Sequence, residues 1–497
     1  MSVSAHHPVL LVAVPLFFAA LCPIWGMWRR EACFPWALLG VVTTGFFAWS
    51  LIGKVTSTRA VTYNAGGWRP PWGIQIRIDF LSLLLICMIT GVGLMVLVYS
   101  WRYVGKELPP EKITYYYTLV LLILTAMLGF SITGDLFNFF VFMEIFSITS
   151  YALVAIVGGP RAVRAAFKYL LMGATSSITV VLAIALLYSA TGSLNMLDIS
   201  NRLKTTSYLP VAGVALVFFI AAFSVKAALF PVHVWLPDAH SIAPSPISAL
   251  LSALVIKMGV LGIFRILFTV YGHTFSDLSS TWSHVAGVVS WAAALAIVLG
   301  SIMAIMQRDL KVMIAYSSVA QIGYILLGIT MLSPLGMVGG LYNMLAHAMG
   351  KACLFLVAGS IIYKHGLRRI EDMRGLGRTM PVTAGAFALA SLSIVGLPPS
   401  AGFVAKWYIL WGCFQKGNFA FVVIVLLGSL LSAIYCFRVV YYMFFAGARE
   451  RGATFDEAPL TMYFPAAVLS AGTLFFGVFA GLVIPFLSNA CRAVLMR

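Results

Sequence analysis

Charged residues are scarce in this sequence of 497 residues, because Asp, Glu, Lys and Arg together make up only 9% of it. Soluble globular proteins average about 25% charged residues, so the scarcity excludes a soluble domain and a disordered chain. Cysteine is also rare, and the seven cysteines show no CxxC spacing and fall mostly within apolar stretches. The sequence therefore predicts neither a disulfide framework nor a cysteine metal site.

Motifs for cofactors and catalysis are absent as well. The sequence contains no Walker A loop, no GxGxxG, no HExxH and no histidine pair spaced to hold a heme between helices. We therefore predict no cofactor, no metal and no redox or hydrolytic centre in this chain. The net charge is +17, but the basic residues stand singly or in small groups between apolar stretches. Such placement argues against nucleic acid as a partner, because no continuous basic stripe forms.

Apolar residues are what the sequence has in abundance: 61% are hydrophobic, and the mean hydropathy is +0.99. A transmembrane helix needs roughly 20 apolar residues, and fourteen segments of about that length or longer can be recognised. We therefore predict an all-α integral membrane protein with about 14 transmembrane helices. The predicted segments are 8–28, 34–53, 80–101, 113–133, 135–157, 166–190, 210–240, 246–270, 283–306, 312–332, 334–363, 380–415, 418–446 and 461–488.

The basic residues between segments predict how the chain is oriented in the cell (inner) membrane. Loops after odd-numbered segments hold 17 Lys and Arg residues, whereas the other loops and the two termini hold nine. Because cytoplasmic loops carry the basic excess, both termini are predicted on the outer side. Two basic residues within segments, Arg265 and Arg438, cannot release a proton and are interpreted as anchors at segment ends.

Two of the segments contain prolines that interrupt a helix. Pro231 and Pro237 lie in the seventh segment, and the adjacent Pro398 and Pro399 lie in the twelfth. Proline removes a backbone donor and clashes with the preceding turn. Helices 7 and 12 are therefore predicted to be discontinuous, with free backbone polar groups near the middle of the membrane.

The spacing of lysines around these breaks predicts an internal repeat. Lys226 and Lys406 are 180 residues apart, and Lys168 and Lys351 are 183 apart. Paired broken helices are typical of transporters built from repeats, and the odd number of spans per repeat makes the halves inverted. The predicted organisation is N-terminal helices 1–3 (1–112), a first five-helix repeat (113–270), a second (283–446) and a C-terminal helix 14 (461–497).

One carboxylate of the fifteen lies well inside a predicted span. Glu144 is about nine residues, or roughly 13 Å, into the fifth segment, close to the middle of the bilayer. An ionisable group at that depth costs several kcal/mol, so it normally has a partner and a function. The alternative is a static ion pair that only holds two helices together.

Three lysines in separate spans, Lys226, Lys257 and Lys406, are the predicted partners of Glu144 in proton translocation. Burial favours the neutral amine, so a buried lysine can release a proton near neutral pH, whereas a nearby ionised carboxylate favours the charged form. Movement of Glu144 towards or away from Lys226 would therefore load or unload a proton. Hydroxyls and imidazoles could relay protons between these lysines, although a lone histidine is often only structural. The candidate relay residues are His233, His347, Lys351, Ser317 and Ser318.

Five stretches carry a resemblance to a known family. They are TGDLFNFFVFMEIFSITSYALVA around Glu144, FSVKAALFPVHVWLPDAHSIAPSPISALLSALVIKMG with Lys226 and Lys257, RDLKVMIAYSSVAQIGY, LAHAMGKACLFLVAGSI with His347 and GLPPSAGFVAKW with Lys406. Over about residues 75–445, the chain resembles the proton-conducting antiporter-like subunits of respiratory complex I, Mrp-type Na⁺/H⁺ antiporters and membrane-bound hydrogenases. The resemblance implies fourteen helices, two inverted five-helix repeats and a lateral proton path from Glu144 and Lys226 through Lys257 to Lys406.

Length and the phrase GDLFNFFVFMEI are most similar to the Mrp D type of antiporter protein, which implies a proton-translocating subunit of a multisubunit cation/proton antiporter. Its expected partners are other membrane subunits, the lipid bilayer, protons and Na⁺ as a candidate second ion. Two alternatives stay open. One is a proton-pumping subunit of a redox-driven complex of the hydrogenase or NADH-quinone oxidoreductase type, whose enzyme activity would belong to partner subunits. The other is a structural membrane spacer.

Overall fold

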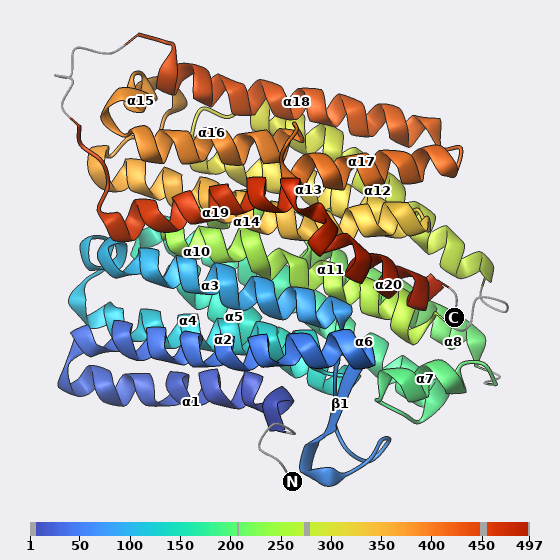
Figure 1. The fold of residues 1–497 in the computed structure, drawn as a ribbon. Helices are drawn as coiled ribbons and strands as arrows, with labels where there is room; N and C mark the ends of the chain where they lie inside the picture. The colour runs from blue at the N-terminus through green and yellow to red at the C-terminus, as the bar shows by residue number, and fades with distance from the viewer. Residues whose placement is uncertain (1–5, 206–207, 273–278, 448–454, 496–497) are drawn as a thin grey trace.

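The computed structural model describes residues 6–205, 208–272, 279–447 and 455–495, which form a long bundle of roughly antiparallel helices (Figure 1). Among these residues, thirteen helices are long and apolar enough to cross a membrane. The prediction of an essentially helical, multi-pass membrane protein is therefore confirmed. The thirteen are α1 (His7–Trp28), α2 (Cys33–Thr58), α3 (Phe80–Glu107), α4 (Pro110–Ile132), α5 (Leu136–Ala155), α6 (Gly159–Thr191), α8 (Leu209–Lys226), the helix Ser245–Val270 that contains α10 (Ser245–Leu250) and α11 (Ile256–Phe264), α12 (Ser279–Met306), α13 (Leu310–Thr330), α14 (Pro334–His365), α18 (Phe419–Phe444) and α19 (Leu460–Val478).

Both predicted helix breaks are present. In the seventh segment, α8 ends at Lys226 and helix resumes only at α9 (Leu236–Ile242). In the twelfth, α16 (Pro381–Val395) and α17 (Ala401–Gln415) are separated by five residues, and each is too short to cross the membrane alone. The α16–α17 pair occupies the predicted twelfth segment but is not among the thirteen, so the total of about 14 transmembrane helices stays a prediction.

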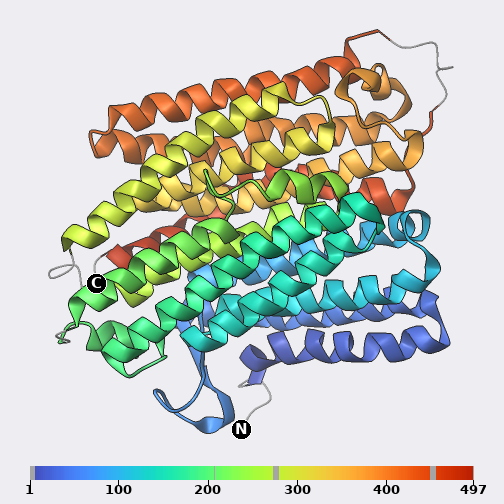
Figure 2. The same cartoon turned by 180° about the vertical axis from the view of Figure 1, so that it is seen from behind.

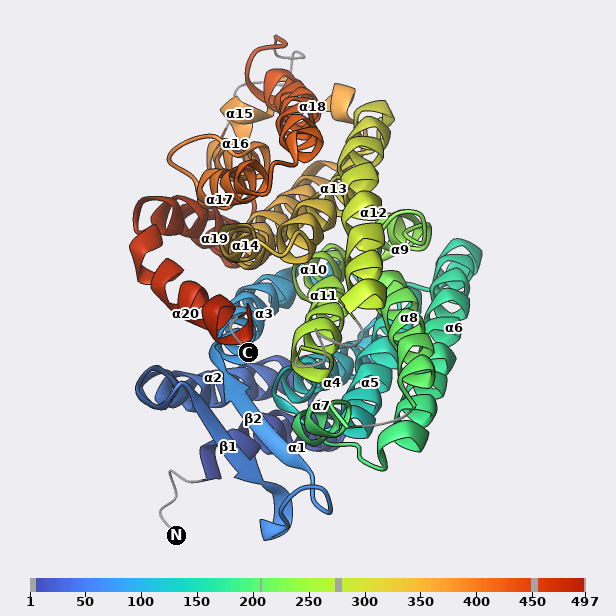
Figure 3. The ribbon, with the colours of Figure 1, turned by 90° about the vertical axis from the view of Figure 1, so that its right-hand side faces the viewer.

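Two other segments differ from the sequence-based prediction. Between α2 and α3 the chain forms an antiparallel hairpin of β1 (Ala60–Asn64) and β2 (Gln75–Asp79), which the all-α assignment missed. β-branched and aromatic residues alternate with polar ones in both strands, a pattern that favours extended structure. The predicted final span 461–488 is present as α19 but extends too far, because α19 ends at Val478 and a short turn separates it from α20 (Ile484–Leu495). Figure 3 shows α20 turning away from α19 across the bundle.

The buried centre of the bundle lies in three helical segments. The most apolar window of Ser245–Val270 is 100% buried, and those of α14 and α13 are 94% and 89% buried. Seen end-on, these segments occupy the middle, whereas α1, α6 and α18 lie at the rim (Figure 3). Polar side chains on the central helices are therefore surrounded by protein and must find partners there or in internal water.

Two helical hairpins are closed in the same way. Asp135 bridges Asn195 at the ends of the α5–α6 hairpin, and Asp309 bridges Arg369 at the ends of the α13–α14 hairpin. Each aspartate also caps the helix that follows it, because its carboxylate accepts backbone N–H groups. The two bridged residues are 60 positions apart in each hairpin. Each residue of the second bridge lies 174 positions after its counterpart in the first. This correspondence supports the two repeats, 113–270 and 283–446, which stay a prediction.

With this offset of 174 residues, the position in the first repeat that corresponds to Lys351 is Ser177 and not Lys168. Lys168 lies near the exposed start of α6 and forms an ion pair with Asp238 at 2.6 Å, whereas Lys351 is fully buried. The view from behind shows α5, α6 and α8 side by side on this face (Figure 2). The spacing of Lys168 and Lys351 in the sequence therefore does not reflect equivalent environments.

Candidate functional site

Glu144 and Lys226 are connected through a third side chain. Glu144 lies half-buried on α5, and Lys226 is the last residue of α8 and only 5% exposed. Among the described residues the two make no ion pair. Instead, the Ser177 hydroxyl on α6 donates to Glu144, and Lys226 Nζ donates to the same hydroxyl at 3.3 Å. Ser177 is therefore a hydrogen-bonded bridge between the predicted partners.

Neutral groups supply the remaining contacts of Lys226. Its Nζ donates to Ser147 Oγ at 2.8 Å, to the Gly173 carbonyl at 3.2 Å and to the Tyr151 hydroxyl at 3.5 Å. Sequence analysis missed these residues, although a signal existed for two of them. Ser147 and Tyr151 lie three and seven positions after Glu144 and therefore share its helix face.

Removing the bridging hydroxyl is a specific test of this connection. In Ser177→Ala, we expect proton-coupled transport by the assembled complex to fall by about tenfold or more, because Glu144 loses its hydrogen-bonded link to Lys226. The matched control is Ser176→Ala, since the Ser176 hydroxyl is equally buried but bonds the Ala222 carbonyl. Equal rates of the two variants in vesicles loaded with a pH-sensitive dye would contradict a role for the bridge.

Lys257 lies at the centre of the bundle on α11 and is fully buried. Its Nζ donates to the Ser252 carbonyl at 2.5 Å. Ser252 belongs to a π-helical turn, 251–255, and such turns leave a backbone carbonyl open for a side chain. The Ser252 hydroxyl in turn contacts Ser318 Oγ at 2.8 Å, which places the predicted relay Ser318 beside the central lysine.

His347 and Lys351 are one turn apart on α14, and both face the same interior. His347 has Lys257 and Lys351 as its charged neighbours, and in the described part of the chain neither ring nitrogen has a hydrogen-bond partner. Lys351 Nζ bonds the Ser317 hydroxyl and the Ile314 carbonyl, the latter at 2.9 Å. The structure thus brings four predicted residues, Lys257, His347, Lys351 and Ser317, into one buried cluster.

The second helix break holds Lys406. Its Nζ donates to the carbonyls of Ile394 and Val395 at 3.0 and 2.8 Å and to Ser429 Oγ at 3.1 Å. The ammonium also lies 4.3 Å from the centre of the Tyr324 ring. Because α16 ends at Val395, its last carbonyls have no partner within the helix and remain free to accept from the lysine.

His233 is placed differently from the prediction. It lies half-buried in the break between α8 and α9, where its ring packs near Phe230 and Tyr316, and Lys168 is its charged neighbour. No contact with Lys226 or Lys257 is seen in the part of the chain that the structure describes. A role of His233 between the lysines therefore stays a prediction that this geometry does not favour.

His240, at the same broken segment, occupies the interior instead. It is fully buried, stacks on Phe355 at 4.8 Å between ring centres, and has neither ring nitrogen bonded among the described residues. Its charged neighbours are Lys257, Lys311 and Lys351. His233 precedes Pro237 and lies in the break itself, whereas His240 follows Pro237 on α9, which packs against α13 and places the ring on Phe355 of α14.

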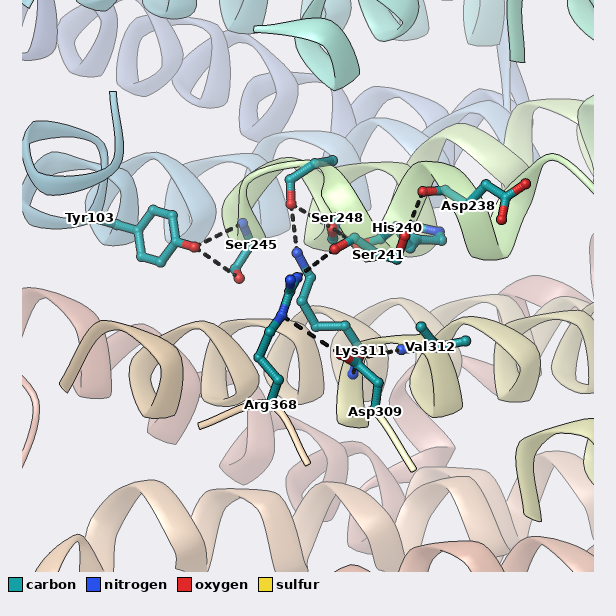
Figure 4. Close-up of polar contacts among 11 residues, drawn as sticks. Tyr103, Asp238, His240, Ser241, Ser245, Ser248, Asp309, Lys311, Val312 and Arg368 are labelled. Carbon is teal, nitrogen blue, oxygen red and sulfur yellow. Dashed lines mark hydrogen bonds and ion pairs between the residues drawn. The ribbon is translucent and has the colours of Figure 1, made fainter. Parts of the chain in front are cut away.

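Lys311 is a buried lysine that sequence analysis counted as a loop residue. It is 3% exposed, and its Nζ donates to the Ala243 carbonyl at 2.5 Å. Figure 4 shows its side chain pointing from the start of α13 towards the segment between α9 and α10, beside Arg368. Arg368 pairs with Asp309 at 3.6 Å and donates to the Ser241 carbonyl at 2.5 Å. Hydropathy could not predict that Lys311 is buried, because the residue lies at a segment end. Its side chain points into the protein only because it belongs to the first turn of α13.

Arg265 and Arg438 have static partners, as the anchor interpretation expects. Arg265 donates to both carboxylate oxygens of Asp79, at 2.5 and 2.9 Å, and Arg438 donates to the backbone carbonyls of Ile305 and Gln307. Burial alone would raise the pKa of Asp79, but the Arg265 guanidinium holds it well below its usual range. Asp79 therefore remains ionised and cannot carry protons at neutral pH.

Two family models match the chain. The model of the NADH:quinone oxidoreductase/Mrp antiporter transmembrane region matches residues 133–432, and that of the complex I chain 5 N-terminus matches residues 65–109. The first covers every residue of the buried clusters around Lys226, Lys257 and Lys406.

Individual relatives are similar over nearly their whole length. The N subunit of NADH-quinone oxidoreductase from Desulforudis audaxviator is 39% identical, with 96% of each chain covered. The D subunit of the Na⁺/H⁺ antiporter from Bacillus subtilis is 30% identical, with 92% of this chain and 90% of the relative covered.

Solved structures show the same fold. A chain of the Mrp complex from Dietzia is 25% identical with a TM-score of 0.89, and the match covers 100% of this chain and 98% of the other. A chain of the membrane-bound sulfane sulfur reductase, an archaeal respiratory membrane complex, is 31% identical with a TM-score of 0.90, with 98% and 97% covered.

Proposed function

Because this chain belongs to the family of NADH:quinone oxidoreductase and Mrp antiporter membrane subunits, we propose that it translocates protons as a subunit of a multisubunit cation/proton antiporter of the Mrp D type. The observation that carries the proposal is the set of buried lysines in the bundle, two of them at helix breaks. Groups that accept and release protons thus follow one another from Glu144 on α5 to Lys406 on α17. Such intramembrane ionisable groups mark proton relays.

The first half of the proposed path depends on a movable carboxylate. When Glu144 bonds Ser177 and faces Lys226, its negative charge favours a protonated Lys226. When Glu144 rotates away, Lys226 keeps only neutral acceptors, and burial then favours release of the proton. The pair therefore acts as a switch whose two states differ in the position of one side chain.

The second half receives the proton through the central cluster. Lys257, His347 and Lys351 face one another, and no carboxylate of the described residues lies between them, so charge on one disfavours charge on the next. Mutual repulsion would drive a proton onward to the Lys406 amine, and the free carbonyls of the broken helix accept hydrogen bonds from the ammonium that results. His240 and Lys311 extend the cluster towards the ends of α9 and α13, which we propose face the cytoplasm, with both termini outside.

Partner subunits are part of the proposal, because the similar solved chains come from multisubunit membrane complexes. Glu144 is half-buried on the bundle surface among exposed apolar residues such as Val141 and Ile148. A carboxylate there would meet lipid unless another membrane subunit covered it. The relevant membrane is the cell membrane, and Na⁺ is assigned to the whole complex rather than to a site in this chain.

A redox-driven proton pump is the second candidate, favoured by the 39% identity to an NADH-quinone oxidoreductase subunit. Mass spectrometry of the gently solubilised complex distinguishes the two candidates. The antiporter predicts only small hydrophobic partner subunits, whereas the pump predicts partners that carry iron–sulfur or nickel centres.

The lysines in the second half of the proposed path can be replaced to distinguish a proton-translocating subunit from a structural spacer. In Lys257→Ala/Lys406→Ala, we expect proton-coupled transport by vesicles with the purified complex to fall by about a hundredfold or more, because the path loses two proton carriers. Lys416→Ala, at an exposed lysine just after α17, is the matched control and should transport at the normal rate. Near-normal transport by an assembled double variant would support the spacer instead.

A further inference from the structure

We propose that a chain of five hydroxyl groups on α13 and α18 carries the proton from Lys351 to Lys406. Its members, in order, are Ser317, Tyr435, Ser432, Tyr324 and Ser429. The inference rests on the proposed function and adds a defined route through the second half, with four residues that the sequence did not single out. We call these five residues the hydroxyl chain.

The first part of the hydroxyl chain starts at Lys351. Lys351 Nζ donates to Ser317 Oγ, and Ser317 and Tyr435 are side-chain neighbours. The Ser317 hydroxyl itself donates to the Ile314 carbonyl at 2.8 Å, so it must rotate to pass a proton to Tyr435. Tyr435 then donates to Ser432 Oγ at 3.1 Å. Exposure is 1% for Ser317 and 0% for Tyr435 and Ser432, so these groups lie away from lipid and bulk water.

The second part of the hydroxyl chain ends at Lys406. The Tyr324 hydroxyl donates to the Val425 carbonyl of α18 at 3.3 Å, with Ser432 and Ser429 of the same helix as side-chain neighbours, so it must rotate to join them. Lys406 Nζ donates to Ser429 Oγ at 3.1 Å. The Tyr324 ring also lies against the Lys406 ammonium, 4.3 Å from ring centre to nitrogen. Tyr324 thus has two roles: its hydroxyl belongs to the hydroxyl chain, and its ring stabilises the positive charge of Lys406.

The three hydroxyl residues on α18 are spaced so that they lie on the same side of the helix. Ser429, Ser432 and Tyr435 are three residues apart in turn and therefore line one face of the helix. Cys436, on the same face, has both Lys351 and Lys406 as charged neighbours. One face of α18 therefore spans the distance between the two lysines.

A second row of polar groups also leads to Lys406, but it cannot transfer a proton from one group to the next. Asn343 donates to Gln321, and Gln321 donates to the Ile394 carbonyl, which also accepts from Lys406. A backbone carbonyl has no proton to pass on, so this route ends at Ile394. Every member of the hydroxyl chain, in contrast, carries an O–H group that can both donate and accept once it rotates towards its neighbour.

The transfer balances in protons and charge. The Lys351 ammonium gives a proton to Ser317 as the Ser317 proton passes to Tyr435. The same exchange is repeated along the chain until the Ser429 proton reaches the neutral Lys406 amine. Lys351 ends neutral, Lys406 ends positively charged, and each hydroxyl keeps one proton but with reversed orientation. Rotation of the hydroxyl groups then resets the chain.

Removal of single hydroxyls tests the proposal in the assembled complex. We expect Tyr435→Phe, which keeps the ring, to lower the proton translocation rate by about a hundredfold and to change its ratio in H₂O and D₂O. The matched control is Tyr99→Phe, because the Tyr99 hydroxyl is equally buried but bonds the Leu356 carbonyl at 2.9 Å, away from the chain. A mere packing role for Tyr435 would leave the isotope ratio unchanged.

An isosteric pair at Ser429 separates the hydroxyl from side-chain volume. Ser429 is only half-buried, so α18 has room there for a larger side chain. Ser429→Thr should retain transport, whereas Ser429→Val, of the same shape without the hydroxyl, should lose it. Normal rates in both Tyr435→Phe and Ser429→Val would overturn the hydroxyl chain. If Lys226→Ala is still inactive in that case, the proposed function stands and only this route fails.

Discussion

Replacing Lys226 by alanine is expected to abolish proton-coupled transport while the complex still assembles. Lys226 is the only described side chain that contacts both Ser147 and the Ser177 bridge to Glu144, so its removal interrupts the path where protons are loaded. Loss of a group that transfers protons typically costs about 10²–10⁴-fold in rate. Glu144→Gln should have a similar effect, because the amide keeps a hydrogen bond to Ser177 but loses the charge.

The measurement is the acidification of vesicles that contain the purified complex, with assembly checked on native gels. Lys168→Ala is a suitable control, since this exposed lysine of α6 pairs with Asp238 and lies outside the buried path. The mechanism is wrong if assembled Glu144→Gln and Lys226→Ala complexes both transport at the wild-type rate.

Substitution of Gly259 is expected to destabilise the protein strongly. A Cβ at this position would lie 2.2 Å from the backbone nitrogen of Ala227 and 2.6 Å from the carbonyl carbon of Lys226. α11 therefore packs directly against the backbone where α8 breaks, and backbone cannot move aside as a side chain can. We expect Gly259→Ala to cost about 3 kcal/mol or more, because it forces Lys226 and Lys257 apart.

Two measurements check this prediction: the amount of assembled complex in the membrane, and the Tm of the purified complex. Gly91→Ala on α3 is the control, because a Cβ there meets no atom within 4 Å. Alanine exceeds glycine in helix propensity by about 1 kcal/mol, so Gly91→Ala should keep or slightly raise the Tm. Equal Tm values for the two variants would contradict the close approach of α11 to the break.

The parts of the fold that were predictable depend on local chemistry. Proline interrupts a helix wherever it stands in the interior, so the breaks near Lys226 and Lys406 could be located from four prolines. Hydropathy likewise located the membrane spans and isolated Glu144 within one of them. The β1–β2 hairpin and α20 were missed because hydropathy describes how apolar a segment is, and not whether it is extended or bent.

The parts of the site that were not predictable depend on contacts between distant helices. Ser177 is 33 residues from Glu144 and 49 from Lys226, and nothing in its own segment distinguishes it from the adjacent Ser176. Lys311 follows a loop, and its burial arises only because α9 and α10 pack over the start of α13. In helices apolar on all sides, periodicity cannot show which face meets which neighbour.

The two helix breaks give their lysines different counter-charges. Lys226 is opposed through Ser177 by Glu144, whose carboxylate belongs to a side chain and not to the backbone. Lys406 is opposed by the last carbonyls of α16, Ile394 and Val395, where the helix macrodipole amounts to about half a negative charge fixed in the backbone. At the first break, a side-chain carboxylate therefore attracts the Lys226 ammonium strongly and can be withdrawn if the side chain moves. At the second break, backbone carbonyls attract the Lys406 ammonium more weakly and stay in place. Along the proposed path, a proton would therefore meet a different kind of counter-charge at each break.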